Sequence, residues 1–74
     1  MRKINLNTFG NKLRFMLWER GISIKKLSEH VGVSGPTISM YISDSRIPYV
    51  NTFKAMCEYM ELTDEEILEW MRTL

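Results

Sequence analysis

The sequence has little cysteine and no long apolar stretch. Cys57 is the only cysteine, so no intramolecular disulfide can form and the fold does not depend on an oxidising compartment. No segment reaches the roughly 18 consecutive apolar residues that a membrane-spanning helix needs. The first residues, MRKINLNTFG, lack the apolar run and the small-residue cleavage site of a secretory signal peptide. We therefore expect a cytoplasmic protein.

Groups that could support catalysis or bind a metal are also scarce. His30 is the only histidine, and no cysteine or carboxylate stands at metal-ligand spacing from it. No serine or cysteine has a base partner, and the chain has no phosphate-binding loop and no cofactor motif. Cys57 falls on the apolar stripe of a predicted helix, which favours a small core residue over a nucleophile. We expect no enzyme, no metal, no cofactor and no small-molecule substrate.

The chain has enough apolar residues for one domain, which we place over residues 1–74. Its 74 residues are 45% hydrophobic and include eight aromatic side chains, which argues for a packed core and against disorder. The net charge is only +1, but the charges are segregated. Residues 1–48 hold eight basic and three acidic residues, whereas residues 49–74 hold two basic and six acidic ones. This distribution suggests one face for an anionic partner, although ordinary surface charge could also segregate in this way.

Apolar residues recur at helical spacing along the chain, and no stretch alternates as a strand would. The pattern predicts a first helix from about Thr8 to Arg20, with Thr8 or Asn7 as its cap and Gly21 as its end. Its inward stripe consists of four apolar residues at i, i+4, i+7 and i+8: Phe9, Leu13, Met16 and Leu17.

Two short helices follow, joined by the turn GVS. Ser23 caps the first of them, which ends at Gly32, and Ser34 caps the second. Pro36 fits the first turn of that second helix because its missing N–H would have no partner within the helix. Two helices joined by a tight turn with a glycine form a helix-turn-helix unit, here at about residues 23–43.

Two more helices complete an all-α fold. One begins near Asn51 or Thr52, and the other follows a capping box formed by Thr63 and Glu66. The last helix carries an apolar stripe, which consists of Ile67, Trp70, Met71 and Leu74. That stripe fits either the closing of the core or a two-fold dimer interface, and the sequence leaves both open.

The segment LRFMLWERGISIKKLSEHVGVSGPTISMYISDSRIPYVNTFKAMCEYMELT, from Leu13 to Thr63, resembles the DNA-binding domain of the phage Cro/CI repressor (XRE-type) family. The matching positions include Gly21, Leu27 and Pro48, together with the runs Gly32-Val33-Ser34 and Thr37-Ile38-Ser39. The resemblance implies a compact five-helix domain of the lambda-repressor-like fold. It also implies a transcriptional regulator from a phage or mobile element that binds duplex operator DNA in a bacterial host cell, usually as a symmetric dimer.

The resemblance also assigns residues to the DNA. The residues expected to face the groove are Ser34, Gly35, Pro36, Thr37, Ser39, Met40 and Ser43. The residues expected to contact phosphates are Ser23, Lys25, Lys26, Ser45, Arg46 and Arg14. Helix N-termini and cations at these positions suit the anionic backbone.

Three features depart from the family. Ile24 stands where the family often has a phosphate-binding glutamine, and the groove-facing set lacks the long planar side chains that pair with base edges. Phe15, Leu17 and Trp18 occupy positions on the first helix that the family mostly fills with polar residues, and Phe15 and Trp18 are i, i+3 neighbours. They could flank the core or form a protein-binding surface. The residues considered for a protein interface are Phe15, Trp18, Met40, Trp70, Met71 and Leu74.

These departures support an alternative function of a different class. In that alternative, the same fold acts as an antirepressor, binding a partner repressor protein and covering its DNA-binding surface. The near-zero net charge and the neutral helix that begins at Ser34 favour this alternative, whereas the family match favours DNA binding.

Overall fold

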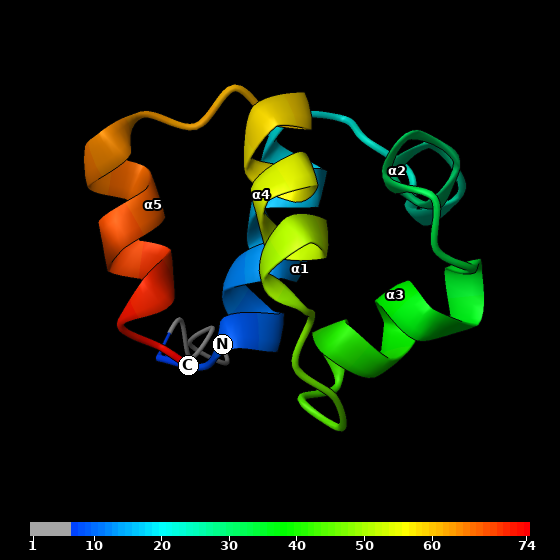
Figure 1. The fold of residues 1–74 in the computed structure, drawn as a ribbon, viewed down its shortest axis with the longest axis horizontal. Coiled ribbons are helices and arrows are strands. Elements are labelled where there is room, and N and C mark those ends of the chain that lie inside the picture. Colours follow the sequence, from blue (N-terminus) through cyan, green and yellow to red (C-terminus); the bar gives the residue numbers. More distant parts are fainter. Residues whose placement is uncertain (1–6) are drawn as a thin grey trace, which may run out of the picture.

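The structure is a computed structural model that describes residues 7–74, and it contains five helices in this part of the chain (Figure 1). They are α1 (Phe9–Glu19), α2 (Ile24–Val31), α3 (Gly35–Ile42), α4 (Val50–Tyr59) and α5 (Asp64–Met71). No strand is present among the described residues, so the predicted all-α class is confirmed. None of the helices within residues 7–74 has the length and apolar character that crossing a membrane requires.

The predicted N-caps explain where four of the helices begin. Thr8, Ser23, Ser34 and Thr63 each accept a hydrogen bond from the backbone N–H three residues further on, at distances of 3.1, 3.1, 3.3 and 3.2 Å. The capping box of α5 is complete, because the side chain of Glu66 also accepts from the N–H of Thr63 at 2.9 Å. These hydrogen bonds satisfy N–H groups that have no partner within their own helix.

The start of α4 was predicted one or two residues too late. The helix begins at Val50, with Tyr49 as its N-cap, and no side chain caps it. The chain leaves the buried Pro48 in an extended conformation, and the carbonyl of Tyr49 already accepts from the N–H of Phe53 at 2.9 Å. Because this start depends on the backbone alone, the sequence carries no capping side chain that marks it.

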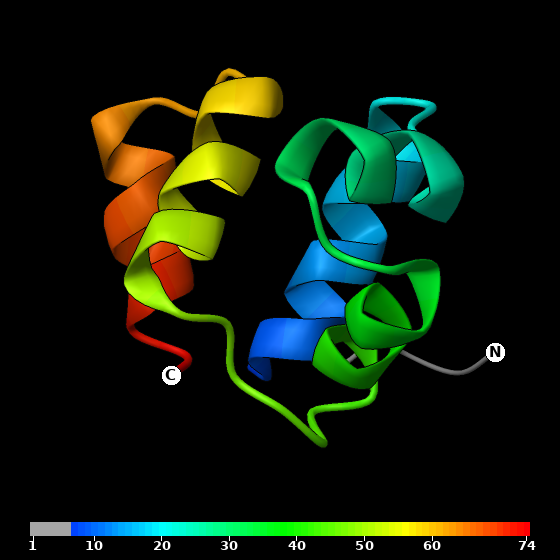
Figure 2. The same ribbon diagram turned by 45° about the vertical axis from the view of Figure 1, so that its right-hand side comes forward.

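The five helices enclose one core, with α1 and α4 between α5 on one side and α2 and α3 on the other (Figures 1 and 2). α1 contacts α3 and α5, while α2 contacts α3 and α4. Each helix contributes one side chain that is completely buried: Leu13, Leu27, Ile38, Met56 and Trp70. The core therefore couples the position of the helix-turn-helix unit to all three other helices.

Trp70 was predicted as a possible protein-interface residue, and its position in the structure corrects this prediction. Its side chain is 0% exposed, its rings stack on Phe9 at a centroid distance of 4.5 Å, and its Nε1–H donates to the carbonyl of Phe9 at 3.2 Å. A side chain buried in this way cannot contact a partner. Of the two predictions for the last helix, the closing of the core is confirmed for Trp70 of α5. The apolar residues Leu68 and Met71 of α5, and Leu74 just after it, remain exposed.

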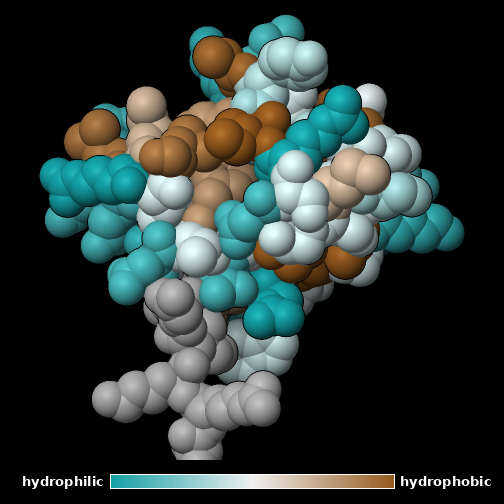
Figure 3. Space-filling view, turned by 90° about the horizontal axis from the view of Figure 1, so that it is seen from below, coloured by the Kyte–Doolittle hydropathy of each residue, from teal (hydrophilic) through white to brown (hydrophobic). Residues whose placement is uncertain are grey.

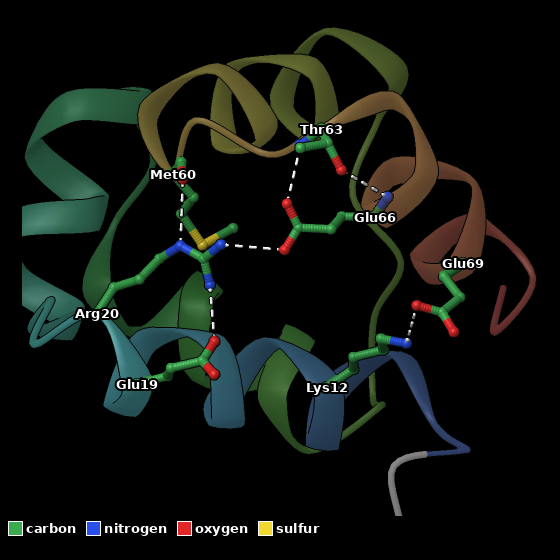
Figure 4. A network of polar contacts seen from close by, with 7 residues as sticks. All are labelled: Lys12, Glu19, Arg20, Met60, Thr63, Glu66 and Glu69. Carbon is green, nitrogen blue, oxygen red and sulfur yellow. Dashed lines mark hydrogen bonds and ion pairs between the residues drawn. The ribbon is translucent and has the colours of Figure 1, made fainter.

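Polar contacts also hold α5 against α1 (Figure 4). The guanidinium of Arg20 at the end of α1 donates to the carbonyl of Met60 at 3.2 Å and to carboxylate oxygens of Glu19 and Glu66 at 3.0 and 3.2 Å. Lys12 forms an ion pair with Glu69 at 3.6 Å. These contacts neutralise two basic residues of the first half of the chain with acidic residues of the last helix.

Candidate nucleic-acid interface

The helix-turn-helix unit consists of α2, the turn 32–34 and α3. Gly32 ends α2 in the left-handed conformation, with φ of +82°, and its N–H donates to the carbonyl of Ser28 at 2.9 Å. A residue with a side chain would be strained at this φ, which explains the glycine. Leu27 from α2 and Ile38 and Tyr41 from α3 are buried in the core, so α3 has one fixed inner face and one outer face.

A second contact, which the sequence analysis missed, fixes α3 against α1. Gly10 packs so closely on the end of α3 that an added Cβ would lie 2.0 Å from the carbonyl oxygen of Ile42. Asp44, just after α3, accepts a hydrogen bond from the N–H of Gly10 at 2.8 Å through its carboxylate. Its own backbone adopts φ of +62°, and the N–H of Ser45 donates to the carbonyl of Met40 at 2.9 Å. Gly10 and Asp44 therefore set the position of α3 relative to the rest of the domain.

The predicted groove-facing residues lie on the outer part of α3. Five of them are exposed: Ser34, Pro36, Ser39, Met40 and Ser43. Gly35 and Thr37 are half-buried. The surface on this side shows mostly side chains of intermediate hydropathy (Figure 3, right-hand part). The structure therefore leaves this face of α3 open to a partner, while it offers neither charge nor amide groups.

Exposed cations flank α3. Lys25 and Lys26 lie in the first turn of α2, next to the Ser23 cap, and Arg46 lies in the loop after α3. Among the described residues, these three form no ion pair, in contrast to Lys12 and Arg20. Arg2 and Lys3, which also contribute to the positive charge of residues 1–48, lie outside the described residues.

A hollow of about 360 Å³ separates the start of α3 from the following loop. It is lined by Ser34 and Thr37 on one side and by Arg46 and Tyr49 on the other. The structure thus brings a helix N-terminus, two hydroxyl groups and a guanidinium to one concave site. Ser45, also predicted to contact phosphate, shares a hydrogen bond with Ser43 at 2.8 Å.

The predicted phosphate residue Arg14 lies elsewhere, on the outer face of α1. There it lines a hollow of about 300 Å³ with Asn11, Phe15 and Trp18. Trp18 is 77% exposed, and its ring lies 6.0 Å from that of Phe15 between centroids. The aromatic pair predicted from the sequence therefore exists on the surface, and Arg14 is grouped with it.

The remaining predicted interface residues are not next to this aromatic pair. Met40 belongs to the outer face of α3, whereas Met71 and Leu74 line an apolar groove of about 280 Å³ between α4 and α5. Pro48, Phe53 and Cys57 also line this groove. Apolar side chains gather on the side of the molecule where α4 and α5 lie (Figure 3, left to centre). The predicted interface set is thus divided among three separate surfaces.

The described part of the chain, residues 7–74, contains no group of three or more histidine, cysteine or acidic residues placed to hold a metal ion. Cys57 is 4% exposed, and its burial, together with the nearby carboxylate of Glu58, raises the pKa of its thiol to about 11. A thiol that is both buried and protonated is a poor nucleophile. The arrangement of helices, cations and open α3 face fits a binding module.

Comparison with known protein families agrees with this geometry. A family model described as a helix-turn-helix domain matches residues 10–69, from α1 to the end region of α5. Comparisons with curated proteins and with solved structures gave no match. The family match spans both helices of the unit and every helix of the core that positions them, so the chain belongs to a helix-turn-helix family, a class of DNA-binding regulatory domains.

Proposed function

We propose that this protein is a transcriptional regulator of the Cro/CI type, from a phage or mobile element, that binds duplex operator DNA with α3 in the major groove. The observation that carries the proposal is the open outer face of α3, together with exposed cations without ion pairs in α2 and in the loop after α3. α3 is held from within by Ile38 and Tyr41, so its outer face can approach a groove without loss of core packing.

The phosphate contacts follow from the same geometry. Lys25 and Lys26 lie in the first turn of α2, where backbone N–H groups have no partner within the helix. Arg46 lies in the loop that follows α3. Cations on both sides of a reading helix would contact the two phosphate backbones that border one groove. Arg14, on the outer face of α1, remains a proposed phosphate contact that is separate from this group.

The test is the salt dependence of binding to duplex DNA, measured by fluorescence anisotropy. We expect the logarithm of the affinity to fall steeply with the logarithm of the salt concentration, and Lys25→Ala and Arg46→Ala each to reduce the slope by about one unit. Arg72→Ala is the matched control, because Arg72 is an exposed cation at the end of α5 and does not line the groove between α4 and α5. Absence of binding to any duplex at low salt would refute the proposal.

We propose dimerisation as part of this function, with the α4–α5 groove as the contact surface. Met71 and Leu74 are 48% and 55% exposed along that groove, and Val50 beside it is 81% exposed. Apolar residues gathered in this way favour burial against a second copy. Analytical ultracentrifugation tests this: Met71→Asp should shift a dimer towards monomer, whereas a wild-type chain that stays monomeric at all concentrations contradicts it.

The antirepressor function is the second candidate, and the exposed aromatic pair on α1 favours it. Trp18 is 77% exposed and lies next to Phe15 over a hollow, an arrangement typical of interaction hot spots. If a repressor encoded nearby binds this protein, Trp18→Ala and Met40→Ala should weaken the complex, as measured by calorimetry. Tight binding to that repressor, without DNA binding at low salt, would favour this candidate over the first.

A further inference from the structure

The polar groups on the outer face of α3 are largely used within the protein. The hydroxyl of Ser43 donates to the carbonyl of Met40 at 3.1 Å, so in its 2.8 Å contact with Ser45 it must accept the hydrogen of Ser45. Both hydrogens of this pair are therefore committed. The hydroxyls of Ser34 and Thr37 lie 2.8 Å apart, and Ser34 also accepts from the N–H of Thr37, so one of their two hydrogens is committed as well.

The hydrogen-bond donors that remain on this face cannot distinguish bases. Ser39 keeps its hydroxyl, and the Ser34–Thr37 pair keeps one hydrogen. A hydroxyl both donates and accepts, so it fits the edge of any base pair equally well. Hydrogen bonds donated by the hydroxyls of α3 therefore supply little sequence selectivity.

Apolar atoms occupy the rest of the surface. Ile24, at the start of α2, is 36% exposed, and its Cγ2 lies 3.9 Å from the position that a Cβ on Gly35 would take. Pro36 is exposed next to Gly35, and Met40, one turn further along α3, is 44% exposed. We name these four residues the apolar strip. Along the chain, Lys25 directly follows Ile24, and Arg46 lies in the loop after α3.

The major groove of DNA contains one apolar group, the C5 methyl of thymine. On the basis of the proposed function, we propose that the apolar strip selects duplex DNA by burying C5 methyl groups of pyrimidines, chiefly those of thymine. The bordering cations supply attraction to the polyanion without regard to sequence, and the methyl contacts supply the selectivity that charge cannot give.

The proposal is tested by adding and removing the methyl without changing the base pairing. Short alternating duplexes of dA·dT are compared with the same duplexes of dA·dU, which lack the methyl. Duplexes of dG·dC are compared with duplexes in which every cytosine carries a C5 methyl. Full-length protein is titrated with each duplex at one fixed low salt concentration. We expect about fourfold tighter binding for each methyl that becomes buried, in both comparisons.

A substitution in the apolar strip tests whether the strip causes the dependence of affinity on the C5 methyl. Met40→Ala should reduce the thymine-to-uracil ratio in the same titrations, and Lys25→Ala, which lowers overall affinity, should leave that ratio unchanged. Circular dichroism verifies that both variants fold. Equal binding with and without the methyl refutes the methyl contact and leaves the proposed function standing. A thymine-to-uracil affinity ratio that Met40→Ala does not change has the same two consequences. Absence of binding to all four duplexes refutes the proposed function and this inference with it.

Discussion

Gly10 offers the sharpest test of how α3 is held in place. In Gly10→Ala, the new Cβ would lie 2.0 Å from the carbonyl oxygen of Ile42 and 2.5 Å from that of Tyr41. Ordinary contacts begin at 3.4 Å, so α1 and the end of α3 would have to separate by more than 1 Å. Both obstacles are backbone atoms, which cannot rotate away as a flexible side chain can.

The change in the free energy of unfolding expected for Gly10→Ala is the difference between two opposing contributions. Forcing extra volume into a tight contact costs about 1–3 kcal/mol, and the displacement also weakens the hydrogen bond from Gly10 to Asp44. Alanine gains at most about 1 kcal/mol over glycine in a helix. We therefore expect a net loss of about 2 kcal/mol in the free energy of unfolding. For a domain of this size, that loss lowers Tm by roughly 10 °C.

Thermal and urea denaturation followed by circular dichroism measure this loss. Gly35→Ala is the matched control, because the nearest atom to its added Cβ is the flexible Cγ2 of Ile24, at 3.9 Å. We expect it to change the free energy of unfolding by less than about 1 kcal/mol. If Gly10→Ala were as stable as the wild type, or Gly35→Ala lost as much, the close α1–α3 approach would be wrong.

Three further predictions concern other parts of the fold. Glu61 has φ of +54° after α4, so Glu61→Gly should raise the free energy of unfolding by about 0.5–1 kcal/mol in urea denaturation, while Glu58→Gly within α4 should lower it by about 1 kcal/mol. The hydrogen bond from the N–H of Thr63, and then the one from Arg20, lower the pKa of Glu66 from its ordinary value of 4.5. The ionised carboxylate therefore stabilises the fold above pH 4.5, and this stabilisation is lost as the pH falls through the lowered pKa. The stability difference between wild type and Glu66→Gln should therefore shrink on acidification in denaturation curves, and a constant difference contradicts the contact. Buried Cys57, with a pKa of about 11, should react with a thiol reagent at neutral pH only as fast as the protein opens, and labelling at the rate of a free thiol contradicts its placement.

Local signals in the sequence predicted the helices well. Thr8, Ser23, Ser34 and Thr63 each bind an N–H within their own first turn, so a few neighbouring residues carry all the information. Gly32 is similar, because the left-handed turn needs it at that position. By contrast, Tyr49 caps α4 with its backbone alone, and the prediction for that start was late.

Contacts between distant residues could not be predicted in the same way. The bond between Gly10 and Asp44 spans 34 residues, and no periodic pattern marks either partner. Lys12 and Arg20 contributed to the basic half of the chain, yet their partners Glu69 and Glu66 lie on α5. On α5 itself, the apolar stripe predicted a buried side without showing that Trp70 would be completely buried, Ile67 half-buried and Met71 exposed. The Gly10–Asp44 hydrogen bond, the ion pairs to α5 and the burial of Trp70 all depend on which helices pack against one another.

The division of α3 into an inner and an outer face bears on how such a protein can change over evolutionary time. Ile38 and Tyr41 anchor the helix, while Ser39 and Met40 make no contribution to the buried core. Under the proposed function, substitutions at those two outer positions would alter what the helix recognises at almost no cost to folding, since exposed sites away from caps and turns usually tolerate change. A lineage could therefore acquire a new target, or a designer could install an amide or guanidinium there, without rebuilding the scaffold.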